Sequence, residues 1–211
     1  MTESLLRLSR PLVLASASPR RRQLLRQIGA EFRVVVSNAD ENAVPTHLAP
    51  DVYVQRLAAM KARAVAESLQ ESAIVIGADT TVVFQGEILN KPLDARDAEA
   101  MLTRLSGNTH EVFTGIALVC RDESGQIKRS LEAVARTEVR FRPLEAREIQ
   151  EYVAGGSPMD KAGAYGIQDD FGAVFVEEIR GCYYNVVGLP LELLYRKLRE
   201  LESGNGATAL V

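Results

Sequence analysis

One apolar run limits the folds open to this chain more than any other feature. Residues Ala73–Ala78 read Ala-Ile-Val-Ile-Gly-Ala, with no polar side chain between them. A continuous run of this kind is typical of a strand buried on both faces, and such strands occur in α/β proteins whose helices cover both sides of a sheet. Asp79 follows directly, so the sequence predicts a carboxylate at the end of a buried strand.

Predicted strands and helices alternate along the rest of the chain. Strands are expected at Leu12–Ala15, Phe32–Val36, Thr81–Phe84, Glu87–Leu89, Glu111–Cys120, Ser130–Phe141 and Ala173–Ile179, and helices at Pro19–Gln27, Pro50–Leu69, Ala95–Leu105, Leu144–Val153 and Pro190–Leu201. Gln85-Gly86 favours a hairpin between the two strands that flank it, and Ser157–Gly172 is predicted to be a loop. The alternation predicts an α/β fold in which helices flank a mixed, twisted sheet.

Composition excludes several classes of protein. The formal net charge is -3 and Trp is absent, so the chain lacks the basic footprint and the stacking aromatics of a nucleic-acid binder. Cys120 and Cys182 form no CxxC pair, which is typical of a reducing compartment. No run approaches the roughly 20 apolar residues of a membrane span, and the apolar run after Arg10 is too short for a signal peptide. We expect a cytoplasmic protein that binds neither nucleic acid nor a membrane.

No repeat or linker divides the sequence. We therefore expect a single α/β domain over residues 11–202, preceded by an N-terminal extension (1–10) and followed by a flexible tail (203–211).

A cluster of arginines opens the first predicted helix. Ser16-Ala17-Ser18-Pro19 leads into Arg20-Arg21-Arg22, with Ser18 as the expected N-cap. Cations at a helix N-terminus are locally unfavourable by up to about 1 kcal/mol each. A bound anion would offset that cost, because backbone N–H groups, serine hydroxyls and guanidinium groups would all point at it. The alternative is a solvated basic helix start, but the strand–turn–helix context favours a phosphate site.

Carboxylates elsewhere could hold a metal ion at such a site. Asp79 falls where open α/β sheets place their ligand crevice, and a buried carboxylate has to be hydrogen-bonded, paired or bound to metal. Asp40-Glu41 lies in a polar loop after the second strand, where a solvated acidic pair is the alternative. Hard oxygen ligands such as Glu41 and Asp79 suit Mg²⁺ or Mn²⁺, which proteins hold with one or two carboxylates plus substrate phosphates.

Two lysines could add to the positive charge. Lys61 is expected on the polar edge of an amphipathic helix, and Lys91 follows the predicted hairpin. Isolated lysines usually lie at the surface, but together with the arginines they would neutralise a polyphosphate. The sequence contains neither the GxxxxGK[ST] motif of P-loop enzymes nor an HExxH motif. These residues favour a metal-dependent enzyme that hydrolyses a nucleoside triphosphate.

Several motifs occur in the order and spacing of one known family. They are Ser16-Ala17-Ser18-Pro19-Arg20-Arg21, Glu41, Leu57-Ala58-x-x-Lys61-Ala62, Gly77-Ala78-Asp79-Thr80, Lys91-Pro92, Ser106-Gly107-x-x-His110-x-Val112-x-Thr114-Gly115, Asp160–Gln168 and Val187-Gly188-Leu189-Pro190. With these motifs the chain resembles the Maf family from about Leu12 to Leu201. Maf proteins are nucleoside triphosphate pyrophosphatases, also described as septum-formation inhibitors. The resemblance implies an α/β molecule with a cleft between two lobes, commonly assembled as a homodimer.

The resemblance also implies roles for individual residues. Asp79 would accept the proton of the attacking water and bind the metal ion together with Glu41, for which Asp40 is the alternative. Phosphate binding is implied for Ser16, Ser18, Arg20, Arg21, Lys61 and Lys91, and substrate choice for Arg20, Thr80 and Gln168. Asp169-Asp170 departs from the family pattern, in which a glycine is expected after Gln168.

The implied reaction converts a nucleoside triphosphate and water into a nucleoside monophosphate and pyrophosphate. The Ala-Tyr-Gly-Ile-Gln form of the motif that ends at Gln168 resembles the branch that acts on dTTP and UTP. Alternatives are the sister activity on 7-methyl-GTP and a non-enzymatic role in regulating cell division.

Overall fold

The structure is a computed structural model of the 211-residue chain, and it describes residues 6–168 and 171–203. Asp169-Asp170 and most of the predicted tail lie outside the described residues. So does the first half of the predicted N-terminal extension.

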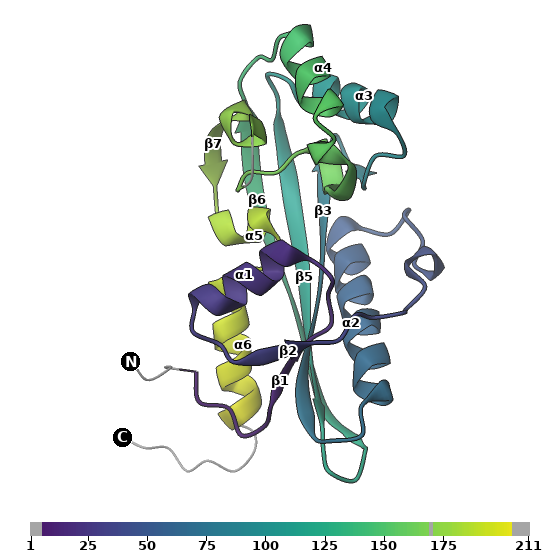
Figure 1. The fold of residues 1–211 in the computed structure, drawn as a ribbon, viewed down its shortest axis with the longest axis vertical. Coiled ribbons are helices and arrows are strands. Elements are labelled where there is room, and N and C mark those ends of the chain that lie inside the picture. Colours follow the sequence, from purple (N-terminus) through teal and green to yellow (C-terminus); the bar gives the residue numbers. More distant parts are fainter. Residues whose placement is uncertain (1–5, 169–170, 204–211) are drawn as a thin grey trace. The chain divides into compact units, whose positions relative to one another are not determined.

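Strands and helices alternate as an α/β fold requires (Figure 1). In chain order the elements are β1 (Leu12–Leu14), α1 (Pro19–Gln27), β2 (Phe32–Val34), α2 (Pro50–Ser68), β3 (Ala73–Phe84), β4 (Glu87–Leu89), α3 (Ala95–Leu105), β5 (Thr109–Arg121), β6 (Ile127–Phe141), α4 (Ala146–Ala154), β7 (Val176–Arg180), α5 (Tyr183–Val187) and α6 (Leu191–Ser203), with short 3₁₀ turns at Glu41–Ala43, Ser157–Asp160, Ala162–Ala164 and Phe171–Phe175.

The sheet is mixed, as predicted. Its strand order is β2-β1-β3-β5-β6-β7, and β4 pairs with β3. β1 is parallel to β2 and to β3, whereas the β3–β4 and β6–β7 pairs are antiparallel. The parallel strands Leu12–Leu14 and Ala73–Ala78 are buried throughout, which confirms the prediction made from their apolar runs.

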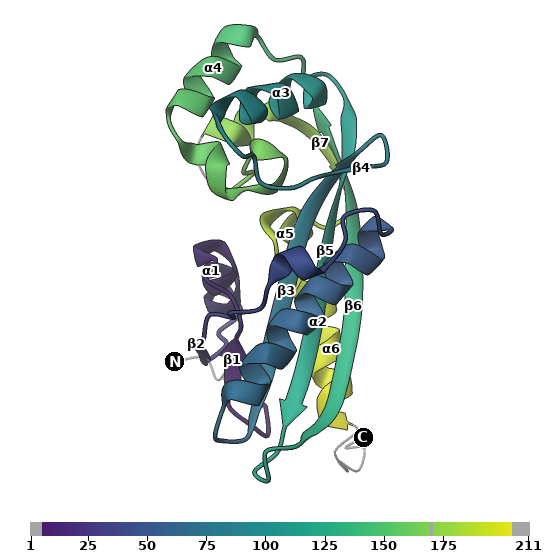
Figure 2. The ribbon, with the colours of Figure 1, turned by 90° about the vertical axis from the view of Figure 1, so that its right-hand side faces the viewer.

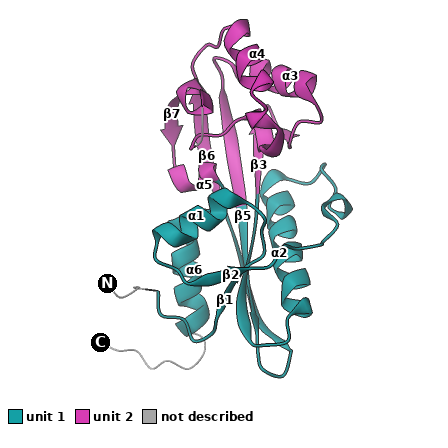
Figure 3. Cartoon of the chain, in the orientation of Figure 1, with its two compact units in different colours: residues 1–79, 115–134, 188–211 teal, residues 80–114, 135–187 magenta. Residues whose placement is uncertain are grey.

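The chain forms two compact units (Figure 3). Unit 1 contains residues 1–79, 115–134 and 188–211, and unit 2 contains residues 80–114 and 135–187. The unit boundaries fall inside β3, β5 and β6, so each of these strands contributes residues to both units. The predicted single domain over residues 11–202 stays a prediction.

In unit 1, α2 packs along one face of the strands (Figure 2). Its Ala58, Ala62 and Val65 form a core cluster with Val13 and Val75 of the sheet. The approach is close at Gly77, where an added Cβ would lie 2.1 Å from the Ala58 carbonyl oxygen and 2.8 Å from the Ala62 Cβ. Only glycine fits at this point, because any side chain would push the helix away from the strand.

In unit 2, the helices α3 and α4 cover one face of the strands (Figure 2). Leu102 and Leu105 of α3 and Ile149 of α4 share a core cluster with Val139 and Phe141 of β6. On the part of β6 that belongs to unit 2, residues 136 and 140 are exposed whereas 137, 139 and 141 are buried. The core of this unit therefore lies on the helix side of the sheet.

Three sequence predictions about secondary structure were wrong. The strands expected at Ala73–Ala78 and Thr81–Phe84 are one continuous strand, β3. β7 begins at Val176 rather than Ala173, because residues 171–175 form a 3₁₀ turn. The short helix α5 was not predicted at all, since its five residues are too few to show a helical period. By contrast, α1 and α3 have their predicted bounds, and the predicted hairpin turns at Gln85-Gly86, both with positive φ (51° and 82°).

We expect Gly77→Ala to lower the free energy of unfolding by about 1–3 kcal/mol, because the new Cβ must displace the α2 backbone. Gly155→Ala is the matched control, since Gly155 has helical φ and ψ (-69° and -7°) and should change stability by less than about 1 kcal/mol. Urea unfolding of both variants measures the difference. Equal stabilities would show that α2 is not held at this point.

Candidate phosphate and metal site

The turn between β1 and α1 forms the first part of the site. Ser18 is the N-cap of α1, as predicted, and its Oγ accepts from the Arg21 backbone N–H at 3.4 Å. Pro19 occupies the first helical position, and the first turn contains no acidic residue. The N-terminus of α1 thus combines the positive end of a helix with arginine side chains, an arrangement suited to an anion.

Ser16 can act only as a donor toward a ligand. Its Oγ accepts from the Ser18 backbone N–H at 3.2 Å and from Arg21 Nη1 at 3.2 Å. Both lone pairs of the hydroxyl are therefore used, and its own proton is what remains. A side chain with only a proton to offer suits an acceptor such as a phosphate oxygen.

Arg21 is tied to the protein on its inner side. Its Nε donates to the Gly188 carbonyl at 2.8 Å, in the Val187–Pro190 motif that precedes α6. Burial lowers the pKa of Arg21, while the negative charges of Asp79 and Glu41 raise it and the charge of Arg20 lowers it. The guanidinium group is thus close enough to both carboxylates to sense their charges, and it is fixed in place before any ligand arrives.

Lys61 connects the two predicted metal ligands. Its Nζ lies 2.7 Å from Asp79 Oδ1 and 2.9 Å from Glu41 Oε2. The Lys61 and Asp79 side chains are 11% and 13% exposed, whereas that of Glu41 is 55% exposed. The ammonium group therefore bridges one largely buried and one accessible carboxylate.

The prediction that Lys61 lies on the polar edge of α2 was wrong. Lys61 belongs to the buried face of the helix, together with Leu57 and Ala58. The apolar residues Tyr53, Leu57 and Met60 predict a buried helix face that includes Met60. Met60 is only half-buried, so the buried face lies further toward Lys61 than these residues indicate. A lysine on a buried face needs an acidic partner, and Asp79 supplies it.

Asp40, the alternative metal ligand, has another role in the fold. Its Oδ1 accepts from the Asn42 backbone N–H at 3.0 Å and caps the 3₁₀ turn Glu41–Ala43. Glu41 directs its carboxylate to Lys61 instead. The geometry therefore favours Glu41 over Asp40 as the partner of Asp79.

These contacts link seven of the predicted site residues within unit 1: Ser16, Ser18, Arg20, Arg21, Glu41, Lys61 and Asp79. Thr80, Lys91 and Gln168 belong to unit 2. Lys91 is exposed after β4, and Gln168 is half-buried at the end of the Asp160–Gln168 loop. The buried Gln168 Oε1 has no hydrogen-bond partner among the described residues, so this amide retains an acceptor for a ligand.

The loop that carries Gln168 is held by several contacts within unit 2. Lys161 is buried, and its Nζ donates to the Ser157 carbonyl at 2.5 Å and to Asp160 Oδ1 at 2.9 Å. Ala164 has a positive φ of 60°, a conformation that costs a non-glycine residue about 1 kcal/mol or more. Strain of this kind persists only where surrounding contacts enforce it. These contacts therefore hold the part of the loop that precedes Gln168 in one conformation.

A contact between His110 of β5 and Tyr165 also holds this loop. The His110 Nε2 and the Tyr165 hydroxyl are 2.8 Å apart, and the His110, Tyr165 and Phe141 rings pack edge to face with centroids 4.7–5.3 Å apart. His110 is 1% exposed. The sequence analysis included His110 and Tyr165 in motifs but assigned neither residue a role.

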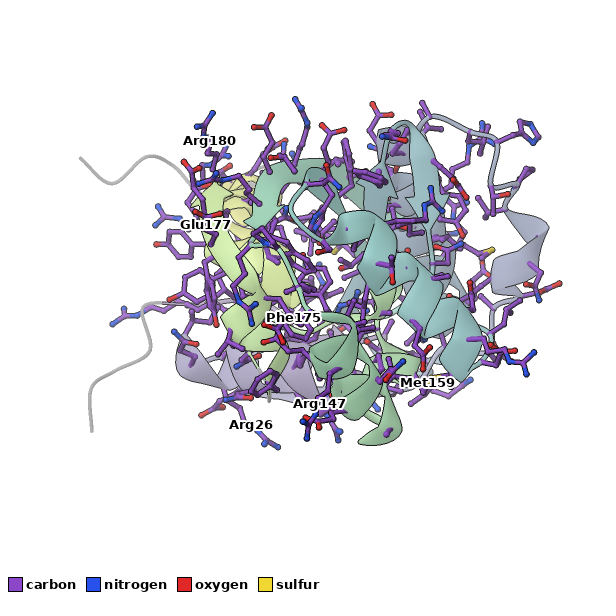
Figure 4. The ribbon with its side chains drawn as sticks, turned by 90° about the horizontal axis from the view of Figure 1, so that it is seen from above. Arg26, Arg147, Met159, Phe175, Glu177 and Arg180 are labelled. Atoms are coloured by element: carbon purple, nitrogen blue, oxygen red, sulfur yellow. The ribbon has the colours of Figure 1, made fainter. Side chains whose placement is uncertain are left out.

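One groove in unit 2 is a weaker candidate for a site. It encloses about 250 Å³ and is lined by Thr109, Glu138, Arg140, Glu178 and Arg180. Arg180 projects outward from β7 (Figure 4). Arg140 and Arg180 are paired with glutamates, at 3.4 and 3.0 Å from Glu178. Because these charges neutralise one another, the groove offers no net charge to a phosphate.

The chain is an α/β protein in which one unit contains both a basic helix N-terminus and a carboxylate pair. The family model for Maf-like protein matches residues 11–201. The chain therefore belongs to the Maf-like protein family. Within residues 6–168 and 171–203, every helix is too short or too polar to cross a bilayer.

Relatives of known name are similar over nearly the whole chain. A dTTP/UTP pyrophosphatase of Salinibacter ruber is 53% identical over 92% of this chain and 93% of its own length. Another, of Symbiobacterium thermophilum, is 52% identical over 90% of this chain and 93% of its own length. Among solved structures, a nucleoside-triphosphatase / dITP/XTP pyrophosphatase of Mycobacterium abscessus covers 92% of this chain and 97% of its own, with 16% identity and a TM-score of 0.42.

We expect His110 to make folding stability fall in acid. Burial lowers the pKa of His110 to about 3, below the value of about 6.5 in an unfolded chain. Between these values the unfolded state binds a proton that the folded state does not, so stability falls as pH decreases, by at most about 1.4 kcal/mol per pH unit. Urea unfolding from pH 6.5 to pH 4 should give a shallower decline for His110→Gln than for the wild type. Parallel curves would contradict a neutral buried His110.

Proposed function

We propose that this protein is a nucleoside triphosphate pyrophosphatase that converts dTTP and UTP into the monophosphate and pyrophosphate. One observation carries the proposal: the donor-only Ser16 and the anchored Arg21 lie in the same unit as two carboxylates joined through Lys61. That unit thus combines groups for binding phosphate with groups for binding a cation and activating water. The names of the relatives, dTTP/UTP pyrophosphatases of about half identical sequence, support the choice of nucleotide.

We assign the triphosphate to the cationic side of the site. The Ser16 hydroxyl and the N-terminus of α1 would donate to phosphate oxygens, with Ser18 holding the turn in place. Arg20 and Arg21 would neutralise the phosphates, helped by Lys61 and Lys91. Because Arg21 already has fixed partners, little side-chain freedom would be lost on binding, which favours catalysis by positioning.

The donor set fits a magnesium or manganese ion. Glu41 and Asp79 both reach the same ammonium group, so their carboxylates are close enough to share one cation. No group of three or more His, Cys, Asp or Glu residues within residues 6–168 and 171–203 is arranged to hold a metal. An ion with only two protein carboxylates typically completes its coordination with water and substrate phosphates. When bound, the ion would neutralise the charge that develops on the phosphates.

Asp79 is the proposed proton acceptor. Water would attack the α-phosphorus and lose its proton to the Asp79 carboxylate, while the bond to the bridging oxygen breaks and pyrophosphate leaves. Lys61, which donates to Asp79 Oδ1, would hold this carboxylate in position. We propose direct attack by water, with Asp79 as its base.

We further propose that Gln168 and Thr80 contribute to the choice of base, and that the protein acts as a homodimer in the cytoplasm. An amide offers both an acceptor and donors, which matches the mixed donor and acceptor edge of uracil and thymine. Light scattering of the purified protein gives the oligomeric state.

We expect pyrophosphate release from dTTP and UTP only when a divalent cation is present, with turnover abolished by a chelator. Ion chromatography separates pyrophosphate from phosphate, and the nucleotide panel includes CTP, ATP, GTP and 7-methyl-GTP. Release of phosphate with a nucleoside diphosphate would refute the assigned cleavage site. Preference for 7-methyl-GTP would instead indicate the sister activity, and no hydrolysis at all would leave the regulatory alternative.

We expect Asp79→Asn to lower kcat by at least about 10²-fold, because loss of a general base alone typically costs about 10²–10⁴-fold. Asp51→Asn, which makes the same change of charge at the exposed start of α2 in unit 1, should leave kcat within about twofold. Circular dichroism checks that both variants are folded. More than a tenth of wild-type activity in folded Asp79→Asn would remove Asp79 from the catalytic role.

A further inference from the structure

The Val187–Pro190 motif contributes a backbone contact to the phosphate site. The Gly188 carbonyl oxygen accepts a hydrogen bond from Arg21 Nε at 2.8 Å. Arg21 and Gly188 are 167 positions apart in the sequence, and both belong to unit 1. The contact therefore ties the basic start of α1 to the segment that leads into α6.

The Arg21 guanidinium group is held by acceptors on two different parts of unit 1. Its Nε donates to the Gly188 carbonyl before α6, and its Nη1 donates to Ser16 Oγ after β1 at 3.2 Å. A guanidinium group is planar, so two hydrogen bonds from two of its nitrogens fix both its place and its tilt. The orientation of the group is therefore set by the protein before a phosphate binds.

The backbone at Gly188 has a conformation that requires glycine. Its φ is 120°, a value that residues with a Cβ avoid. On the C-terminal side, Leu189 is fully buried (0% exposed), and Pro190 restricts its backbone to extended conformations. The Pro190 carbonyl in turn accepts from the Leu194 backbone N–H of α6 at 2.9 Å. The chain after Gly188 is thus held, and its carbonyl keeps one direction.

We propose that Gly188 is a positioning residue, whose carbonyl holds the Arg21 guanidinium group in the orientation in which Arg21 binds phosphate. A side chain at residue 188 would force the backbone out of its positive φ and turn the carbonyl away from Arg21 Nε. Arg21 would keep its charge but lose its fixed orientation, on which catalysis by positioning depends. This inference rests on the proposed function, in which Arg21 neutralises the phosphates of the nucleotide.

The first test replaces the glycine and measures turnover. We expect Gly188→Ala to lower kcat/KM for UTP at least about tenfold, because a displacement of about 1 Å can cost up to about 10²-fold. Gly29→Ala is the matched control, since it also places alanine at a positive φ (69°), at an exposed position in unit 1 just after α1. It should lower the melting temperature and leave kcat/KM within about twofold of the wild type.

A double-mutant cycle separates positioning from a general structural role. If Gly188 acts through Arg21, adding Gly188→Ala to Arg21→Ala should lower kcat/KM by less than about twofold, because the effects of two residues in one contact do not add. An equal fall in the wild type and in the Arg21→Ala background would show that Gly188 acts independently of Arg21, and the proposal would be overturned.

Nuclear magnetic resonance observes the contact directly. The Arg21 Nε–H resonance is assigned by its absence in Arg21→Lys, and we expect its exchange with water to be at least about tenfold faster in Gly188→Ala than in the wild type. The wild type alone gives a second result if Gly188→Ala does not fold. Its Nε–H should stay protected when inorganic triphosphate is added, and loss of protection on binding would show that the guanidinium group leaves Gly188.

Binding of inorganic triphosphate separates this inference from the proposed function. Calorimetry needs no turnover, and we expect Gly188→Ala to weaken the affinity at least about fivefold while Gly29→Ala leaves it unchanged. If the wild type hydrolyses no nucleotide yet shows this pattern, the proposed function fails and the positioning of Arg21 stands. If Gly188→Ala binds triphosphate as tightly as the wild type, the inference fails even when dTTP and UTP are hydrolysed.

Discussion

The close approach of α2 to β3 is the contact on which the rest of the site depends. Gly77 lets the helix backbone lie against the strand, and Lys61 and Asp79 then face each other two residues further along the strand. A side chain at residue 77 would move α2 outward and separate that pair. The buried ion pair is thus a consequence of backbone packing, and the strand must carry glycine where it meets the helix.

Much of the fold could be predicted from the sequence, because local signals and tertiary packing agree there. Apolar runs predicted the buried strands, and Ser18-Pro19 predicted where α1 begins. The parts that could not be predicted depend on contacts between distant residues. Nothing local indicates that Lys61 points inward, because its acidic partners Asp79 and Glu41 lie on other elements. Likewise, α5 is too short for a helical period.

The candidate site, too, could be predicted only in part from the sequence. The residue types predicted a site for a phosphate and a hard cation. In the structure, seven of those residues lie in unit 1. The polarity of the Ser16 hydroxyl could not be predicted, since it depends on the conformation of the turn before α1 and on where the Arg21 side chain lies. Ser16 has both lone pairs used, by the Ser18 backbone N–H and by Arg21, so its hydroxyl suits an acceptor such as a phosphate oxygen.

The lysine between the carboxylates has a thermodynamic consequence. With Lys61 in contact with both Asp79 and Glu41, the three side chains together carry one negative charge rather than two. A divalent ion arriving alone would compete with the ammonium group, whereas a triphosphate would give that group a further acceptor beside Asp79 and leave Glu41 to the ion. Metal and nucleotide would therefore each raise the affinity for the other by the same factor, as linkage requires. On the proposed function, the protein would therefore take up the ion and the nucleotide together.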